Sequence, residues 1–303
     1  MSIKSTQNKM EENQEKFARQ ILAFGKDGQR CISNAKVGIV GLGGIGSLVA
    51  QMLAYLGVKD FVLIDDDIVE ESNLNRLIAA SREDMVKKTP KVDIAARVII
   101  SINPKAANKK IFNNLRSQEA IDVLCGAPEV IFGCVDNDGA RLMLAELSSA
   151  YNKVLVDSGA EIINNQEFQE FGGRVIVARP GDFCLLCAGE IDLEVARQEL
   201  ESAEEKNFQE KLGYGLGGGV PDPSVISLNS IIAGLAVTEF LMFVTGLREP
   251  NRRVTYRGMR GVFRESIDKK RDNCIICNSL AGEGEKADIK RYIRKGLPKD
   301  LPI

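Results

Sequence analysis

The sequence predicts an α/β protein with a doubly wound, mostly parallel sheet and an antiparallel extension, and three observations lead to this prediction. A short apolar run at Val37 to Val40 is followed by a glycine-rich turn, an apolar helical pattern and a second apolar run at Phe61 to Ile64. Further buried-strand patterns at 130–134 and 154–157 are separated by helical periodicity, which is typical of parallel sheets. A longer two-sided strand at 168–178 would then close the sheet in the antiparallel sense.

The turn after the first strand predicts a nucleotide site. Gly41, Gly43 and Gly46 have the spacing G-x-G-x-x-G, with an additional Gly44. Glycines let phosphate approach the backbone, and the start of the following helix offers free N–H groups. The second strand ends at Asp65, about 20 residues past the last glycine, where an acid can accept hydrogen bonds from ribose hydroxyls. The order of strand, glycine turn, helix, strand and acid predicts a Rossmann-like unit that binds an adenine nucleotide.

The residues that follow this acid favour a triphosphate. Ser72 to Arg76 places the amide of Asn73 and the guanidinium of Arg76 just past Asp65. A hydride-transferring dehydrogenase needs no cation there, whereas a phosphate-cleaving site does, because charge accumulates on the phosphate oxygens in the transition state. Lys91 stands at the start of the next helix, where the sequence pattern alone indicates a solubilising surface charge.

The strand at 130–134 is followed by Asp136, Asn137 and Asp138. Ligands of open α/β sheets bind beyond the carboxyl ends of the strands. We expect Asp138 to cap the following helix, which leaves Asp136 as a hard carboxylate ligand for the Mg²⁺ that accompanies ATP.

Four of the seven cysteines form two Cys-x-x-Cys pairs, Cys184 with Cys187 and Cys274 with Cys277. Two such pairs can supply the four thiolates of a closed, structural Zn²⁺ site. The alternative is two independent redox or buried pairs. The other three cysteines, Cys31, Cys125 and Cys134, all lie outside the segment between the two pairs.

Composition excludes several functional classes. The chain has 303 residues, 44% of them hydrophobic, and a net charge of −2, which gives no reason to expect nucleic acid as a partner. Because the sequence contains no histidine, Ser-His and Cys-His nucleophile pairs are excluded. The N-terminus is polar, and the apolar stretch at 228–247 is interrupted by Asn229 and Glu239. We therefore expect a buried core helix there, no membrane span, and a cytoplasmic protein.

Several motifs together resemble the ubiquitin-activating-like adenylyltransferases, the ThiF/MoeB/HesA superfamily. The likeness covers about residues 15–278, with its motifs in the family's order. The matching segments are Arg19-Gln20-Ile21, Gly41 to Gly46, Asp65 with Asp67, Ser72 to Arg76, Pro90-Lys91-Val92, Cys134 to Asn137, and the two cysteine pairs.

The resemblance implies ATP-dependent adenylation of a carboxylate, with ATP, Mg²⁺ and a structural Zn²⁺ as cofactors. It implies that Asp65 and Asp67 belong to the nucleotide site, that Asn73, Arg76 and Lys91 contact phosphates, and that Asp136 holds magnesium. It further implies a homodimer in which Arg19 reaches the partner's ATP.

The implied domain organisation is a frayed start at 1–15, an adenylation domain at 16–278 with a flexible crossover segment at 189–223, and a charged tail at 279–303. We also expect a short helix at 16–24 and a polar loop at 79–89. The substrate implied is the C-terminal glycine of a small ubiquitin-fold or sulfur-carrier protein. The alternatives are a ribosomal precursor peptide, a non-catalytic nucleotide-binding scaffold and a nicotinamide dehydrogenase. Members of the family that form a thioester need a thiol near the crossover segment, which this sequence lacks.

Overall fold

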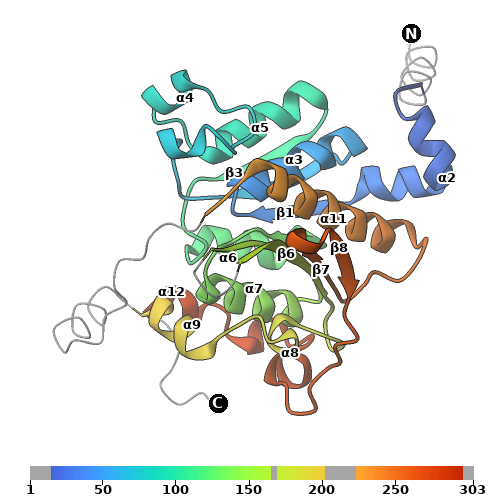
Figure 1. Ribbon diagram of the computed structural model, residues 1–303. Coiled ribbons are helices and arrows are strands. Elements are labelled where there is room, and N and C mark those ends of the chain that lie inside the picture. The colour runs from blue at the N-terminus through green and yellow to red at the C-terminus, as the bar shows by residue number, and fades with distance from the viewer. Residues whose placement is uncertain (1–14, 165–168, 202–222, 296–303) are drawn as a thin grey trace, which may run out of the picture.

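One mixed sheet organises the chain. The computed structural model describes residues 15–164, 169–201 and 223–295, and within them eight strands form a sheet in the order β3-β2-β1-β4-β5-β6-β7-β8 (Figure 1). The strands are β1 (Lys36–Val40), β2 (Asp60–Ile64), β3 (Ala107–Ile111), β4 (Val130–Gly133), β5 (Val154–Asn164), β6 (Gln169–Ala178), β7 (Arg253–Arg257) and β8 (Val262–Glu265).

Strands β1 to β5 pair in parallel, and β6 to β8 continue the sheet antiparallel. The predicted mostly parallel sheet with an antiparallel end is confirmed. Strand β1 has β2 on one side and β4 on the other, with Val37 opposite both Phe61 and Val130. The chain therefore reverses its direction of winding between β1 and β4, and ligands of such sheets bind at that switch point.

Helices cover both faces of the sheet. In Figure 1, α3, α5 and α11 lie above the sheet, whereas α6, α7 and α8 lie below it. The helices are α2 (Ala18–Asn34), α3 (Gly44–Leu56), α4 (Arg82–Val86), α5 (Lys91–Ile102), α6 (Gln118–Gly126), α7 (Asp138–Ala150), α8 (Leu185–Ala188), α9 (Leu193–Leu200), α11 (Ile226–Thr245) and α12 (Arg291–Lys295). Short turns of other helix types occur at Glu71–Asn73, Gly258–Arg260, Ile276–Leu280 and Gly284–Ala287.

The helix α11 is long and apolar enough to cross a membrane by length and composition alone. In this fold it packs on α3, α2, β5 and β6. Its acidic residue, Glu239, is buried and is paired with Arg248 at 2.6 Å. These contacts match the expected core helix.

Three segments differ from the expectations. The N-terminal helix α2 runs to Asn34, far beyond the expected end at 24, and a left-handed Gly25 kinks it rather than ending it. Part of the expected loop at 79–89 forms α4, because Ser81 and Asp84 cap the helix reciprocally. Within the segment expected to be flexible, α9 forms under a cap by Asp192. Residues 1–14 and 202–222 of the segments expected to be frayed or flexible lie outside the described residues.

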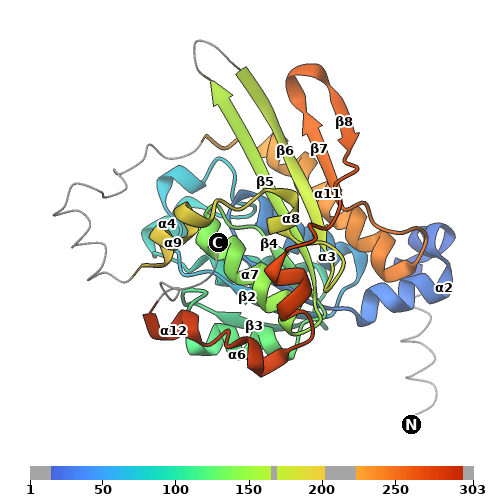
Figure 2. The ribbon, with the colours of Figure 1, turned by 90° about the horizontal axis from the view of Figure 1, so that it is seen from below.

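The chain after the second cysteine pair also packs onto the body as far as it is described. Tyr292 on α12 is fully buried, and its hydroxyl donates to Glu146 of α7 at 2.7 Å. Figure 2 shows the β5–β6 and β7–β8 hairpins projecting beyond the helices at the top of the view, away from α12.

Candidate nucleotide site and cysteine cluster

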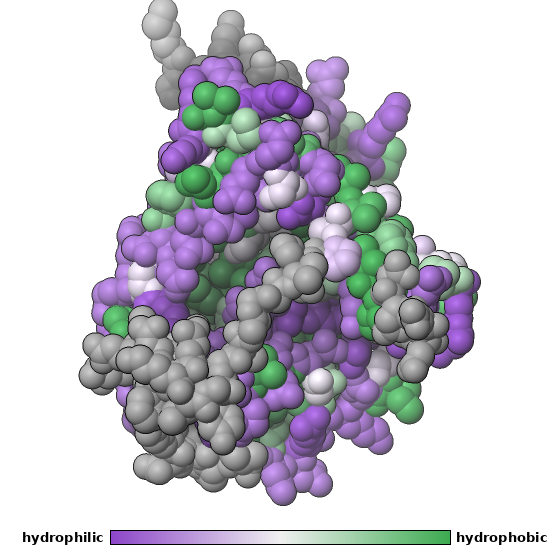
Figure 3. All heavy atoms as spheres, turned by 60° about the vertical axis from the view of Figure 1, so that its left-hand side comes forward, coloured by the Kyte–Doolittle hydropathy of each residue, from purple (hydrophilic) through white to green (hydrophobic). Residues whose placement is uncertain are grey.

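A cavity of about 1020 Å³ lies at the carboxyl ends of β1, β2 and β4 and beside Ser158, Gly159 and Ala160 in the middle of β5. The glycine turn, the acidic run after β2, the polar residues after β4 and the start of α11 all line it. The face shown in Figure 3 is hollowed, and apolar and polar side chains meet in the hollow. The cavity thus occupies the switch point between β1 and β4.

The glycines of the turn serve different purposes. Gly41 has φ of +83°, and a Cβ there would come within 2.5 Å of the Cys134 carbonyl oxygen. A Cβ on Gly46 would overlap the carbonyl oxygen of Gly41, so this glycine permits close packing of α3 on the strand. Gly43 lines the cavity and has open space around its Cβ position, which leaves its backbone free to approach a ligand. Among these four glycines, Gly46 alone does not line the cavity.

The acid at the end of β2 is held in place by backbone groups. Asp65 is buried, and its carboxylate accepts hydrogen bonds from Leu42 N at 2.6 Å and Asp67 N at 2.9 Å. Burial raises the pKa of Asp65, while the nearby Lys91 ammonium and the two backbone donors lower it. The Lys91 ammonium lies 2.6 Å from the Asp67 carboxylate, and both residues line the cavity. The structure therefore brings Asp65, Asp67 and Lys91 together.

Of the two residues predicted just past the acid, only Arg76 lines the cavity. Its guanidinium donates to the Ser72 carbonyl and to Asn75 Oδ1. Asn73 instead accepts a hydrogen bond from Glu70 N at 3.1 Å and closes a reciprocal cap of the short helix Glu71–Asn73. Arg19 is exposed on α2 and does not line the cavity either.

The polar residues after β4 are arranged differently from the prediction. Asp136 is exposed and lines the cavity, and its role as a metal ligand stays a prediction. The prediction that Asp138 caps α7 is wrong: Asn137 is the cap and accepts from Ala140 N at 2.8 Å. Asn137 has extended backbone angles, whereas Asp138 is already inside the first turn, where it pairs with Arg141 at 2.9 Å.

Other residues of the cavity were missed by sequence reasoning. The loop after β3 contributes Asn114, which donates to Asp66 at 2.8 Å, and Arg116, which donates to the Tyr292 carbonyl. Asn229 and Ser158 are almost completely buried and line the cavity from α11 and β5. The interruption of the apolar run by Asn229 was the one signal in the sequence that pointed to any of them.

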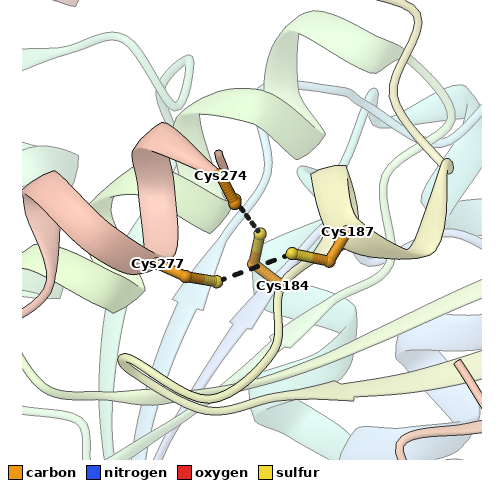
Figure 4. Close-up of side chains that lie close together, drawn as sticks. All are labelled: Cys184, Cys187, Cys274 and Cys277. Carbon is orange, nitrogen blue, oxygen red and sulfur yellow. Dashed lines mark hydrogen bonds between the residues drawn. The ribbon is translucent and has the colours of Figure 1, made fainter. Parts of the chain in front are cut away.

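The four paired cysteines form one cluster. Their sulfur atoms all lie within 4.8 Å of one another, and all four residues are buried. Figure 4 shows the sulfurs facing one another, with Cys184 beside Cys274 at 3.4 Å and Cys187 beside Cys277 at 3.8 Å. Two independent pairs are therefore not supported. Four thiol ligands, with a backbone N–H of Arg271 directed at the Cys187 sulfur, fit a tetrahedral zinc ion.

The remaining cysteines are dispersed. Cys31 is exposed on α2, and Cys125 is half-buried on α6. Cys134 lines the cavity at the end of β4, and burial raises the pKa of its thiol, so the reactive thiolate is disfavoured.

The chain is an α/β protein with a cavity at the switch point of its sheet and a four-cysteine cluster. The family model described as the ThiF family matches residues 17–276. The chain therefore belongs to the ThiF family, which confirms the resemblance of its motifs.

Its relatives include two enzymes that differ in length. The molybdopterin-synthase adenylyltransferase of Escherichia coli (strain K12) is 29% identical over 266 residues, with 86% of this chain and 95% of that enzyme covered. The ubiquitin-like modifier-activating enzyme 5 of Drosophila grimshawi is 27% identical over 281 residues. This alignment covers 89% of this chain and 65% of that enzyme. The chain thus spans slightly less than two thirds of the length of the second relative.

A solved structure with a similar fold is that of MccB of E. coli with ATP, with a TM-score of 0.66, 20% identity, and 87% of this chain and 74% of that chain covered. The microcin C7 biosynthetic enzyme MccB in complex with N-formylated MccA gives a TM-score of 0.69 at 20% identity, with coverage of 88% and 76%. At 20% identity, the likeness to these two structures shows a shared fold and no more.

Proposed function

We propose that this chain is an ATP-dependent adenylyltransferase that activates the C-terminal carboxylate of a small ubiquitin-like or sulfur-carrier protein. The observation that carries the proposal is the composition of one cavity. The glycine turn, Asp65, Arg76, Lys91 and Asp136 all line it, which combines a ribose acid with cations and a carboxylate suited to magnesium. The name of the E. coli molybdopterin-synthase relative supports the same reaction class.

In the proposed reaction a carboxylate oxygen of the substrate attacks the α-phosphorus of ATP. A new bond forms between that oxygen and phosphorus, the bond from phosphorus to the bridging oxygen breaks, and pyrophosphate leaves with the electron pair. The carboxylate is already ionised at neutral pH, so no general base is required. Catalysis then rests on positioning and on neutralisation of phosphate charge.

The predicted site residues have different roles in this proposal. Asp65 accepts from the ribose hydroxyls, and Arg76 and Lys91 face the phosphates. Asp136 supplies the magnesium ligand, because it is exposed at the end of β4 with no cation paired to it among the described residues. Asn73 orders the turn that carries Arg76, since its side chain is used in a cap.

The zinc ion belongs to the proposal as a structural cofactor. The two cysteine pairs are far apart in sequence, and a zinc bound to all four would join α8 to the segment after β8. Four thiolates leave no open coordination position, so the metal would supply stability rather than chemistry. Thiols kept reduced for this purpose suit a cytoplasmic location.

We further propose a homodimer in which Arg19 completes the site of the partner subunit. The support is that Arg19 is exposed on α2 and does not line the cavity of its own chain.

A precursor peptide is the second candidate substrate. The fold likeness to MccB, solved with N-formylated MccA, favours it. Both candidates present a free terminal carboxylate, so the chemistry at the cavity is the same. A nicotinamide dehydrogenase is disfavoured because Arg76 and Lys91 suit a triphosphate.

Activation is proposed to stop at the adenylate, without an enzyme thioester. The sequence has no cysteine between Cys187 and Cys274, and the pKa of Cys134 is raised by burial. The triple variant Cys31→Ser, Cys125→Ser and Cys134→Ser is expected to keep its activity apart from a modest loss of stability. A substrate adduct that survives denaturing gels and disappears with a thiol reductant would refute this part.

Calorimetric titration of the purified protein tests the nucleotide assignment. We expect binding of a non-hydrolysable ATP analogue with Mg²⁺, and at least about tenfold weaker binding of NAD, because Arg76 and Lys91 in the cavity suit the charge of a triphosphate. Stronger binding of NAD than of the ATP analogue would rule out the proposed function.

A further inference from the structure

We propose that Asn229 on α11 is a further positioning residue of the cavity, and that its amide donates a hydrogen bond to the phosphate group held over the glycine turn. This inference rests on the proposed function, because it takes the anion in the cavity to be a nucleotide phosphate.

Asn229 is placed directly against the glycine turn. It lies in the first turn of α11, is 1% exposed and lines the cavity. A Cβ on Gly44 would overlap Nδ2 of Asn229, and Cδ of Arg76 lies 3.6 Å from the same Cβ position. Gly44 is thus flanked by a neutral donor and by the side chain of a cation, so that an anion above this glycine meets both.

The amide keeps a donor available. A buried amide is costly unless it is hydrogen-bonded. Nδ2 of Asn229 donates to Ser224 Oγ at 3.1 Å, and this bond fixes the orientation of the side chain. The NH₂ group has two hydrogens, and the bond to Ser224 uses one of them. The second hydrogen can serve a ligand in the cavity.

The surroundings also favour an anion. The helices α3 and α11 both begin at the cavity, and among the described residues no side chain caps the first N–H groups of either helix. Free N–H groups at a helix start attract phosphates. Independently, the hydroxyl of Ser158, which is 1% exposed and lines the same cavity, has no hydrogen-bond partner among the described residues. An occupied cavity would supply the missing partner for such a hydroxyl.

The test compares two ligands that share the nucleoside and differ in the phosphates. We expect Asn229→Ala to weaken binding of a non-hydrolysable ATP analogue with Mg²⁺ about tenfold, and binding of adenosine less than about twofold. Asn229→Asp has nearly the same shape but places a carboxylate beside the phosphate, so it should weaken the ATP analogue more than Asn229→Ala does. Titration calorimetry gives both affinities, and melting temperatures show that the variants are folded.

The matched control is Ser230→Ala, the next residue on α11, whose hydroxyl bonds back to the Ile226 carbonyl and which does not line the cavity. It should bind both ligands as the wild type does. Unchanged affinity of Asn229→Ala for the ATP analogue, or equal losses for the ATP analogue and adenosine in a folded variant, would overturn the assignment. A different result would separate the two proposals. If Asn229→Ala weakens binding of the ATP analogue but the wild type shows no carboxylate-dependent ATP–pyrophosphate exchange, the proposed function fails and this assignment stands.

Discussion

Asp65 and Lys91 both line the cavity, and the charge of Lys91 opposes the effect of burial on the pKa of Asp65. Burial raises the pKa of Asp65, and the Lys91 ammonium is the largest of the effects that lower it. The ionised carboxylate is the form that accepts hydrogen bonds from Leu42 N and, in the proposal, from ribose. Removal of Lys91 should therefore raise the pKa of Asp65 further.

The first prediction concerns Lys91→Met. Adenosine carries no phosphate, so its binding reports on Asp65 and not on the lost phosphate contact. As pH falls, adenosine affinity should decrease as Asp65 becomes protonated, and the decrease should begin at a higher pH in Lys91→Met than in the wild type. Fluorescence or calorimetric titrations at a series of pH values provide the comparison. Superimposable pH profiles would mean that Lys91 does not influence the ribose acid.

At the residue scale, local sequence patterns predicted the glycine turn but not the cavity residues that come from α11 and β5. Gly41 and Gly46 follow from spacing, because their roles are set within one strand-turn-helix unit. Asn229 and Ser158 come from elements distant in sequence, and only tertiary packing brings them to the cavity. Asp138 was assigned the cap that Asn137 provides, because both residue types cap helices and the sequence alone does not fix the first helical residue.

At the scale of elements, the cysteine cluster joins two distant parts of the chain. The second prediction is that the purified protein contains one zinc per chain, and that Cys274→Ser lowers the metal content and the melting temperature, because loss of one thiolate opens the tetrahedral site. Elemental analysis and thermal melting measure the two effects. Cys31→Ser, which removes an exposed thiol outside the cluster, is the control and should change neither. Protein with four freely titratable cluster thiols and no zinc would contradict the assignment.

A buried chain of ion pairs ties the sheet to the segment that follows the first cysteine pair. Arg174 on β6 lies 2.9 Å from the fully buried Asp157 on β5 and 2.7 Å from Glu190. Glu190 also pairs with Arg253 on β7 at 2.6 Å. Gly159 lies opposite Arg174, and a Cβ there would overlap its guanidinium.

The third prediction is that Arg174→Met destabilises the protein by about 3–5 kcal/mol, because it leaves the Asp157 carboxylate buried without a partner. Arg179→Met removes a partly exposed arginine paired with the exposed Glu249, and should cost no more than about 1 kcal/mol. Urea denaturation of both variants measures the difference. If both variants lose the same unfolding free energy, the buried ion pairs of Arg174 stabilise the fold no more than the partly exposed pair of Arg179.

Periodicity predicted the buried elements better than the exposed ones. The sequence analysis did not identify β3, because its residues Asn108, Lys109 and Lys110 are polar and lie in an edge strand. The helix α9 was hidden in a stretch rich in acids and amides. Its cap at Asp192 is local, but the bond from Gly139 N to Glu199 forms only when α9 packs on α7.

At the scale of the whole molecule, the order of the motifs predicted the fold class and the region of the site. Sequence alone could not show that Asn73 turns away into a cap or that Arg19 stays outside its own chain's cavity. The position of Arg19 depends on how complete elements are placed relative to one another, whereas the Asn73 cap is a local contact with Glu70 that the residue types alone do not fix.

The fourth prediction tests the proposed contribution of Arg19 to the partner's site. Arg19→Ala and Asp136→Ala should each be nearly inactive as homodimers. In a dimer that combines one chain of each kind, one site keeps both residues intact, so random mixing should restore about a quarter of the wild-type activity. Absence of any restoration in a verified heterodimer would mean that Arg19 acts within its own chain, and a fully active Arg19→Ala homodimer would mean that Arg19 has no role in the site.

The central claim is that this cavity transfers AMP from ATP to a carboxylate, and ATP–pyrophosphate exchange tests it most directly. With Mg²⁺ and a small ubiquitin-fold protein or short peptide that has a free C-terminus, labelled pyrophosphate should enter ATP. The same substrate with an amidated C-terminus should give no exchange. Asp136→Asn should lower the rate at least about 100-fold, equivalent to about 2.7 kcal/mol, with little change in melting temperature. Exchange that is independent of the carboxylate, or that is unaffected by Asp136→Asn, would contradict the account.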